Sequence, residues 1–230
     1  MAVACESAGC VVLAVALGPR SPLQVGAWLH DAKLASVSPE CALLLAGVAA
    51  DGRLLAKRAR ARAVEHWFQF DEAQPVAATA ADLAELCASF SRVDDSDDDD
   101  DDDLGRPLGC AALVCGLDGE CAAPVVHHVQ PSGAFRRWRA KAIGDGAEAA
   151  DAVLDAGFTR QMPLADAVAL AERAVRAARP DASAADLDVR VSLLGGDDDA
   201  APPRAPGVAP SAAAALRLRP LRRAAAAAEP

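Results

Sequence analysis

Tyrosine is absent from this sequence, and aromatic residues make up only 3% of its 230 positions. The apolar fraction of 53% comes largely from alanine, and at this length one domain with one sizeable core is expected. No long apolar run is present near the start, because residues 10–17 are too few to span a bilayer and lack the basic flank of a signal peptide. We therefore expect a soluble protein of the cytoplasm and nucleus.

A broad basic surface is also missing. The formal net charge is −10, but nine of the 33 acidic residues are aspartates between positions 94 and 103. The remaining acidic residues nearly balance the 23 basic ones, so the composition gives no argument for a broad nucleic-acid-binding surface. The aspartate run lacks the glycine-spaced ligands of a calcium-binding loop, and like charges at this density repel and stay solvated. It predicts a disordered acidic loop at 93–104.

Paired metal-ligand motifs are absent as well. None of the seven cysteines forms a C-x-x-C pair, and most lie in apolar runs, which favours reduced, buried thiols. His127 and His128 are neighbours on a predicted strand, so their side chains should point to opposite faces and cannot readily bind one metal ion. We predict no metal site and no cofactor.

The first half of the sequence alternates paired strands with helices. Asp51 is placed to cap the first helix, and Thr79 with Asp82 resembles a capping box at the start of the second. The predicted elements are strands at 2–5, 10–16, 31–37 and 41–47 and helices at 52–66 and 80–90.

Three turn signatures divide the second half: Arg-Pro-Leu-Gly at 106–109, Pro-Ser-Gly at 131–133 and Lys-Ala-Ile-Gly at 141–144. Pro163 suits the first turn of a helix, and Pro180 stops it. The predicted elements are strands at 110–116, 125–129, 134–140 and 187–194 and helices at 147–156 and 164–178.

The order of these elements predicts a layered architecture. Strands, two helices, strands, two helices and a last strand imply an α+β fold of four layers, an αββα sandwich with two sheets inside and helices outside. We predict one such domain over residues 1–196. Residues 197–230 are low in complexity and poor in branched apolar side chains, which predicts a disordered tail.

A sandwich of this kind invites the hypothesis of an N-terminal-nucleophile hydrolase, in which the first residue of a strand attacks the substrate. Cleavage at Gly9-Cys10 would expose a cysteine at the head of a strand. It would also remove the strand at 2–5, and residues 17–20 offer no lysine to lower the pKa of the thiol. The glycines Gly144 and Gly146 precede a helix, where a helix-start turn is a simpler interpretation than an anion-binding cradle.

The sequence motifs also resemble those of a second class of proteins with an αββα sandwich. The three turn signatures match Arg-Pro-Phe-Gly, Asp-Pro-Ser-Gly and Lys-Ala-Ile-Gly of proteasome α-type subunits, with Leu108 in place of Phe and Gln130 in place of Asp. The His-Trp-Phe sequence at 66–68 and the acidic insertion before Arg106 are closest to the type-5 α subunit. The resemblance covers about residues 1–194.

This resemblance implies a non-catalytic structural subunit of the proteasome core particle, which acts in ubiquitin-dependent protein degradation. The implied partners are other α subunits in a seven-membered outer ring, the β-ring subunits, and activators or the regulatory particle; neither nucleic acid nor a membrane is implied. By resemblance, Lys33 lies in a pocket that receives the C-terminal carboxylates of activators. The family's N-terminal helix segment has no counterpart before Met1, so we expect it to be lacking.

Two alternatives remain open. One is an N-terminal-nucleophile hydrolase or β-type subunit processed at Gly9-Cys10. The other is a stand-alone binding protein that uses the acidic loop on the same fold.

Overall fold

Two five-stranded antiparallel sheets form the centre of the molecule. The computed structural model describes residues 1–17, 33–91, 106–118, 123–180, 188–195 and 218–220. The strand order is β10-β9-β2-β1-β8 in one sheet and β3-β4-β5-β6-β7 in the other. The strands are β1 (Ala2–Ser7), β2 (Cys10–Leu17), β3 (Leu34–Ser38), β4 (Cys41–Gly47), β5 (Cys110–Asp118), β6 (Ala123–Val129), β7 (Phe135–Trp138), β8 (Ala140–Ile143), β9 (Asp188–Gly195) and β10 (Leu218–Pro220).

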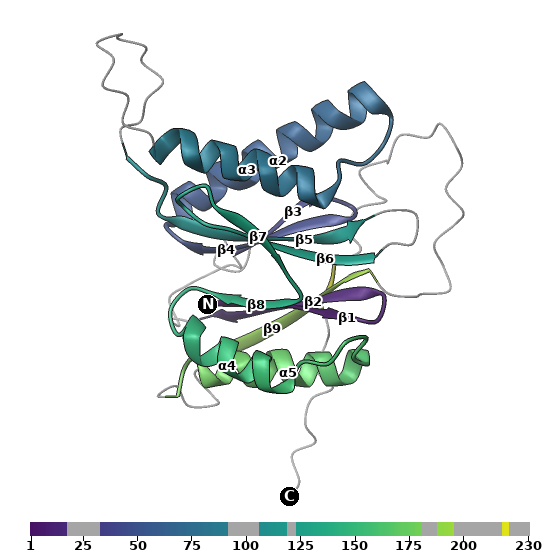
Figure 1. Ribbon diagram of the computed structural model, residues 1–230, viewed down its shortest axis with the longest axis vertical. Coiled ribbons are helices and arrows are strands. Elements are labelled where there is room, and N and C mark those ends of the chain that lie inside the picture. Colours follow the sequence, from purple (N-terminus) through teal and green to yellow (C-terminus); the bar gives the residue numbers. More distant parts are fainter. Residues whose placement is uncertain (18–32, 92–105, 119–122, 181–187, 196–217, 221–230) are drawn as a thin grey trace, which may run out of the picture.

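Each sheet is covered on its outer face by a pair of helices (Figure 1). The helices α2 (Ala49–Phe70) and α3 (Val76–Ser91) lie over the sheet that ends in β7. The helices α4 (Ala147–Gly157) and α5 (Leu164–Ala177) lie over the sheet that contains β1 and β2. The predicted α+β combination of helices and antiparallel sheets is confirmed. Within the described residues, no helix is both long and apolar enough to cross a membrane.

Strand periodicity divides the apolar side chains among three packed layers. In β1, Val3 and Cys5 pack toward α4 and α5, whereas Ala2 and Ala4 pack toward the opposite sheet. All four are fully buried, because successive strand residues point to opposite faces and both faces of this strand are covered. The side chains of Ala2 and Ala4 therefore share the layer between the sheets with larger residues such as Leu13 of β2.

The predicted hairpin between the first two strands is confirmed. Ser7 pairs with Cys10, and Gly9 takes the left-handed conformation (φ 77°) that a tight turn requires and that glycine adopts without steric cost. The turn signature at 131–133 is also confirmed, with Gly133 at φ 83° between β6 and β7.

The predicted helix starts are wrong in both members of the first helix pair. The N-cap of α2 is Val48, and Asp51 lies within the first turn of the helix. Helix α3 begins at Val76, whose backbone N–H donates to Oδ1 of Asp118 in β5 at 2.8 Å. The Asp118 carboxylate therefore accepts a hydrogen bond from an N–H group in the first turn of the helix. The local sequence cannot reveal this contact, because Asp118 is distant along the chain. Thr79 forms no capping box, since its hydroxyl donates to the carbonyl of Pro75.

The predicted strand at 134–140 is confirmed only over Phe135–Trp138, and the predicted turn at 141–144 is wrong because Ala140–Ile143 form a strand. Two short strands occupy this stretch: β7 pairs with β6 in one sheet, and β8 pairs with β1 in the other. Only Arg139 separates them, so the chain passes directly from sheet to sheet (Figure 1).

Two predicted features lie wholly or mostly outside the described residues. The acidic loop at 93–104 is one of them. Of the predicted tail at 197–230, only Leu218–Pro220 is described, and this segment forms β10 and pairs with β9.

Two glycines with the same left-handed φ of 77° offer a matched test of the packing. A methyl group at Gly146 would collide with the carbonyl oxygen of Ala178, whereas one at Gly9 meets nothing within 4 Å. We expect Gly9→Ala to lower the free energy of unfolding by about 1–2 kcal/mol from backbone strain alone. Gly146→Ala should cost roughly 1–3 kcal/mol more through overpacking. Urea unfolding of both variants measures the difference, and equal losses would contradict the packing described for α4.

Candidate functional site

Lys33 lies immediately before β3 and is half-buried. Its Nζ donates a hydrogen bond to the carbonyl oxygen of Ala16 in β2 at 2.8 Å. The ammonium thus bridges the two sheets near the end of β2 that is remote from the Gly9 turn. The docking role that the resemblance gives to Lys33 stays a prediction.

Cys10, the candidate nucleophile, is a packed strand residue. It is only 2% exposed, and burial raises the pKa of its thiol despite a hydrogen bond with Ser7 that lowers it. A protonated, buried thiol is a poor nucleophile. Cleavage before Cys10 would also remove β1, which is hydrogen-bonded to β2 on one side and β8 on the other.

The two histidines point to opposite faces of β6. His127 is buried, with its ring centroid 6.3 Å from that of Phe135, and burial lowers its pKa. Burial also lowers the pKa of His128, and Lys141 of the other sheet lowers it further. In the part of the chain that the structure describes, no group of three metal-ligating side chains comes together. Gly146 is the N-cap of α4 and packs against Ala178, as a helix-start turn does.

A buried carboxylate, Asp51, holds helix α2 to the segment that leads into β5. Asp51 is 4% exposed and accepts a bidentate pair of hydrogen bonds from Arg106, at 2.9 and 2.8 Å. The backbone N–H of Gly109 donates to the same carboxylate at 2.8 Å. The Arg106 and Gly109 hydrogen bonds hold the pKa of Asp51 at about 2. The Arg-Pro-Leu-Gly signature is therefore an anchor for the segment that leads into β5, which the turn pattern alone did not reveal.

A second ion pair performs the same task in the other half of the molecule. The Lys141 ammonium in β8 binds the Asp151 carboxylate in α4, and the same carboxylate accepts the backbone N–H of Ala142 at 2.9 Å. Lys141 also lies 4.9 Å from the ring centroid of Trp138. These contacts fix α4 against β8.

The C-terminal end of α2 carries apolar side chains that the described residues leave uncovered. Val64 is 67% exposed, Phe68 is 88% exposed and Phe70 is 56% exposed. This end of the helix projects beyond the sheet below it (Figure 1). The helix is capped at this end, because Asp71 takes the left-handed conformation and its backbone N–H donates a hydrogen bond to the carbonyl oxygen of Trp67. Val64 and Phe68 lie one turn apart on the same face of the helix, and an exposed apolar patch on an ordered element is typical of a protein–protein contact.

Comparison with known proteins defines the class. The sequence pattern of the Proteasome subunit family matches residues 1–192, so the chain belongs to the proteasome subunit family.

Among the curated relatives, the Drosophila melanogaster protein named proteasome subunit alpha type-5 is 34% identical over 69% of this chain and 62% of its own length. The Schizosaccharomyces pombe protein named probable proteasome subunit alpha type-5 is 30% identical over 76% of this chain and 68% of its own length. An archaeal protein from Pyrococcus horikoshii, named proteasome subunit alpha, is 28% identical over 69% of this chain and 56% of its own length. The chain thus spans about two thirds or less of the relatives it matches, and the resemblance to the α-type, type-5 subunit is confirmed.

The Asp51 carboxylate should make stability depend on acid pH. Its pKa is about 2 in the folded chain against an ordinary value of 3.8, so it stabilises the fold fully above pH 3.8, and this contribution is lost as the pH falls toward 2. We expect Asp51→Asn to lose stability at pH 7 and to show a smaller decline between pH 4 and 2 than the wild type. Urea midpoints across this range measure it.

The control is Asp155→Asn, which removes an exposed carboxylate from α4. It should keep the pH profile of the wild type. Identical acid profiles for Asp51→Asn and the wild type would contradict the role of this carboxylate.

Proposed function

We propose that this chain is a non-catalytic, α-type subunit of the proteasome core particle. In this proposal it forms part of the outer seven-membered α ring, stacked on the β ring, and acts in ubiquitin-dependent protein degradation in the cytoplasm and nucleus. Its helix–sheet–sheet–helix layers are then the αββα sandwich of the N-terminal-nucleophile hydrolases, used as a scaffold. Family membership and the α-type relatives support the proposal.

The observation that carries a structural role is the exposed apolar end of α2. Phe68 and Phe70 would be costly to leave in water, since burying such a side chain is worth about 1.5–3 kcal/mol. A subunit of a ring has neighbours to cover this surface, whereas a free monomer does not. The buried thiol of Cys10 and the paired strand before it give no support to a processed nucleophile.

Assembly should depend on this surface. We expect the double substitution Val64→Ser and Phe68→Ser to reduce the fraction of an affinity-tagged chain that co-purifies with other proteasome subunits by several-fold, because it removes apolar contact area from the interface. Quantitative mass spectrometry of the purified particles measures this fraction.

The control is Gln69→Ser, an exposed polar position on the same helix that should assemble like the wild type. Circular dichroism of the isolated chains should show that both variants keep the fold, since the substituted side chains are exposed. Normal incorporation of the Val64 and Phe68 variant would refute this role for α2.

The enzyme alternative makes an opposite prediction about the Gly9–Cys10 peptide bond. If β1 is an integral strand, peptides that span this bond should be recovered from the chain purified out of assembled particles. Tryptic or Glu-C mapping of such particles measures this. Recovery of Cys10 as an N-terminal residue would favour a processed nucleophile and contradict the proposal.

A further inference from the structure

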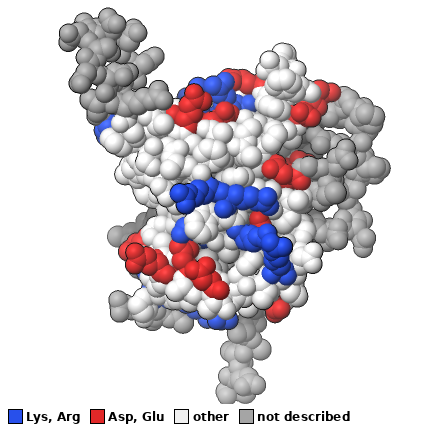
Figure 2. All heavy atoms as spheres, in the orientation of Figure 1, with Lys and Arg blue, Asp and Glu red and all other residues white. Residues whose placement is uncertain are grey.

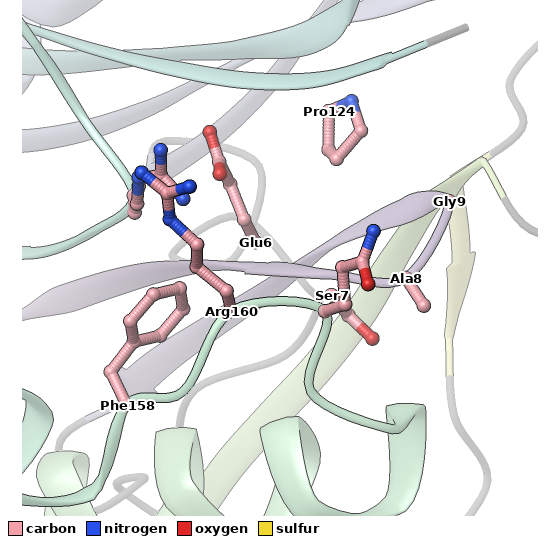
Figure 3. Close-up of a pocket in the computed structure, with 9 residues that line it drawn as sticks. Glu6, Ser7, Ala8, Gly9, Pro124, Phe158 and Arg160 are labelled. Atoms are coloured by element: carbon pink, nitrogen blue, oxygen red, sulfur yellow. The ribbon is translucent and has the colours of Figure 1, made fainter. Parts of the chain in front are cut away.

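A cavity of about 730 Å³ opens at the Gly9 end of β1, which is opposite to the end near Lys33. The hairpin turn, the start of β6 and the segment between α4 and α5 form its walls. Its lining includes Glu6, Gly9, Pro124, Arg139, Phe158 and Arg160. Figure 3 shows Glu6 and Arg160 extending into the same space, with Phe158 beside the arginine.

Backbone contacts fix the walls of this cavity. The Ser7 hydroxyl donates to the carbonyl oxygen of Met162 at 2.9 Å, and the Ala8 N–H donates to the same oxygen at 3.2 Å. The Glu6 N–H donates to the carbonyl oxygen of Arg139 at 2.7 Å. Gln161, also in the lining, has a left-handed φ of 56°, which a residue with a side chain adopts only under constraint. These contacts tie the hairpin turn to the segments that precede β8 and α5.

The charges around the cavity are unbalanced. Glu6 is its single described carboxylate; its Oε1 forms an ion pair with Nη2 of Arg137 at 3.7 Å, and Arg139 also interacts with it electrostatically. Arg139 and Arg160 are exposed, and neither forms an ion pair with a residue whose position is described. The lining thus holds two guanidinium groups, Arg139 and Arg160, and one carboxylate that Arg137 already pairs with from outside the lining. Positive side chains gather across the middle of this face of the molecule, with acidic ones above and below (Figure 2).

The neighbouring strand offers a second kind of contact. β7 is the last strand of its sheet, and all four of its residues are exposed. Along its outer edge no described strand pairs with it, so its backbone can bond to an extended peptide. A peptide uses both the arginines and the strand edge, whereas a nucleic acid uses only the arginines.

We infer that this cavity, together with the β7 edge, binds an acidic segment of a partner protein, whose carboxylates are held by Arg139 and Arg160. Guanidinium groups pair with carboxylates through short, charge-assisted hydrogen bonds, often two at a time. The site is distinct from the Lys33 end of the sandwich and is independent of the proposed ring function.

Fluorescence anisotropy of the full chain tests this inference. The probe is a labelled peptide of alternating Glu and Gly, and the reference is the same peptide with Gln in place of Glu. We expect the Glu peptide alone to bind, and the double substitution Arg139→Gln and Arg160→Gln to weaken binding by about tenfold or more through loss of charge-assisted hydrogen bonds.

The matched control is Arg53→Gln with Arg58→Gln, which removes two exposed arginines from α2 and should leave the affinity unchanged. Equal losses in the two double variants would mean non-specific charge attraction and would overturn the inference. So would the absence of binding by the wild-type chain. Tighter binding of a labelled oligothymidylate that the cavity variant abolishes would assign the site to nucleic acid instead.

Discussion

The direct passage of the chain from one sheet to the other at Arg139 is the constraint on which the layered structure depends. A single residue separates β7 from β8, so an edge strand of one sheet is joined directly to an edge strand of the other. The crossing is secured on both sides, by the hydrogen bond from Glu6 to Arg139 and by the ion pair between Lys141 and Asp151. Between the sheets, the alanines of β1 pack with larger side chains such as Leu13 and Leu113 in one buried cluster.

This constraint separates the molecule into regions with different roles. The crossing places the cluster of arginines beside the hairpin turn, which creates a basic cavity at one end of the sandwich. The helices lie outside the sheets and are free to present contact surfaces, as the exposed aromatic end of α2 does. The carboxylate of Asp51 holds that helix to the loop before β5 through Arg106. The ion pairs fix the helices to the sheets, and the outer surface carries apolar and charged patches. A subunit of a larger assembly needs both features.

Much of the fold could be predicted from local patterns, because hairpins and amphipathic helices carry short-range signals. Gly9 and Gly133 mark turns whose backbone geometry only glycine adopts easily. The change of sheet at Arg139 carries no such signal, because the sequences of β7 and β8 together look like one continuous strand. The roles of Asp51 and Asp118 were missed for a related reason: each carboxylate bonds to a segment more than 40 residues away. The basic cavity likewise joins four separate segments of the sequence: residues 6–9, Pro124, Arg139 and residues 158–161.

The central claim is that this chain acts as one subunit of a proteasome ring rather than alone. Native mass spectrometry of the complex that contains the tagged chain, isolated from its own cells at physiological salt, tests this most directly. The account predicts a particle many times the mass of one chain that also contains other proteasome α and β subunits. A species with the mass of a single chain, or an assembly without proteasome subunits, would contradict it.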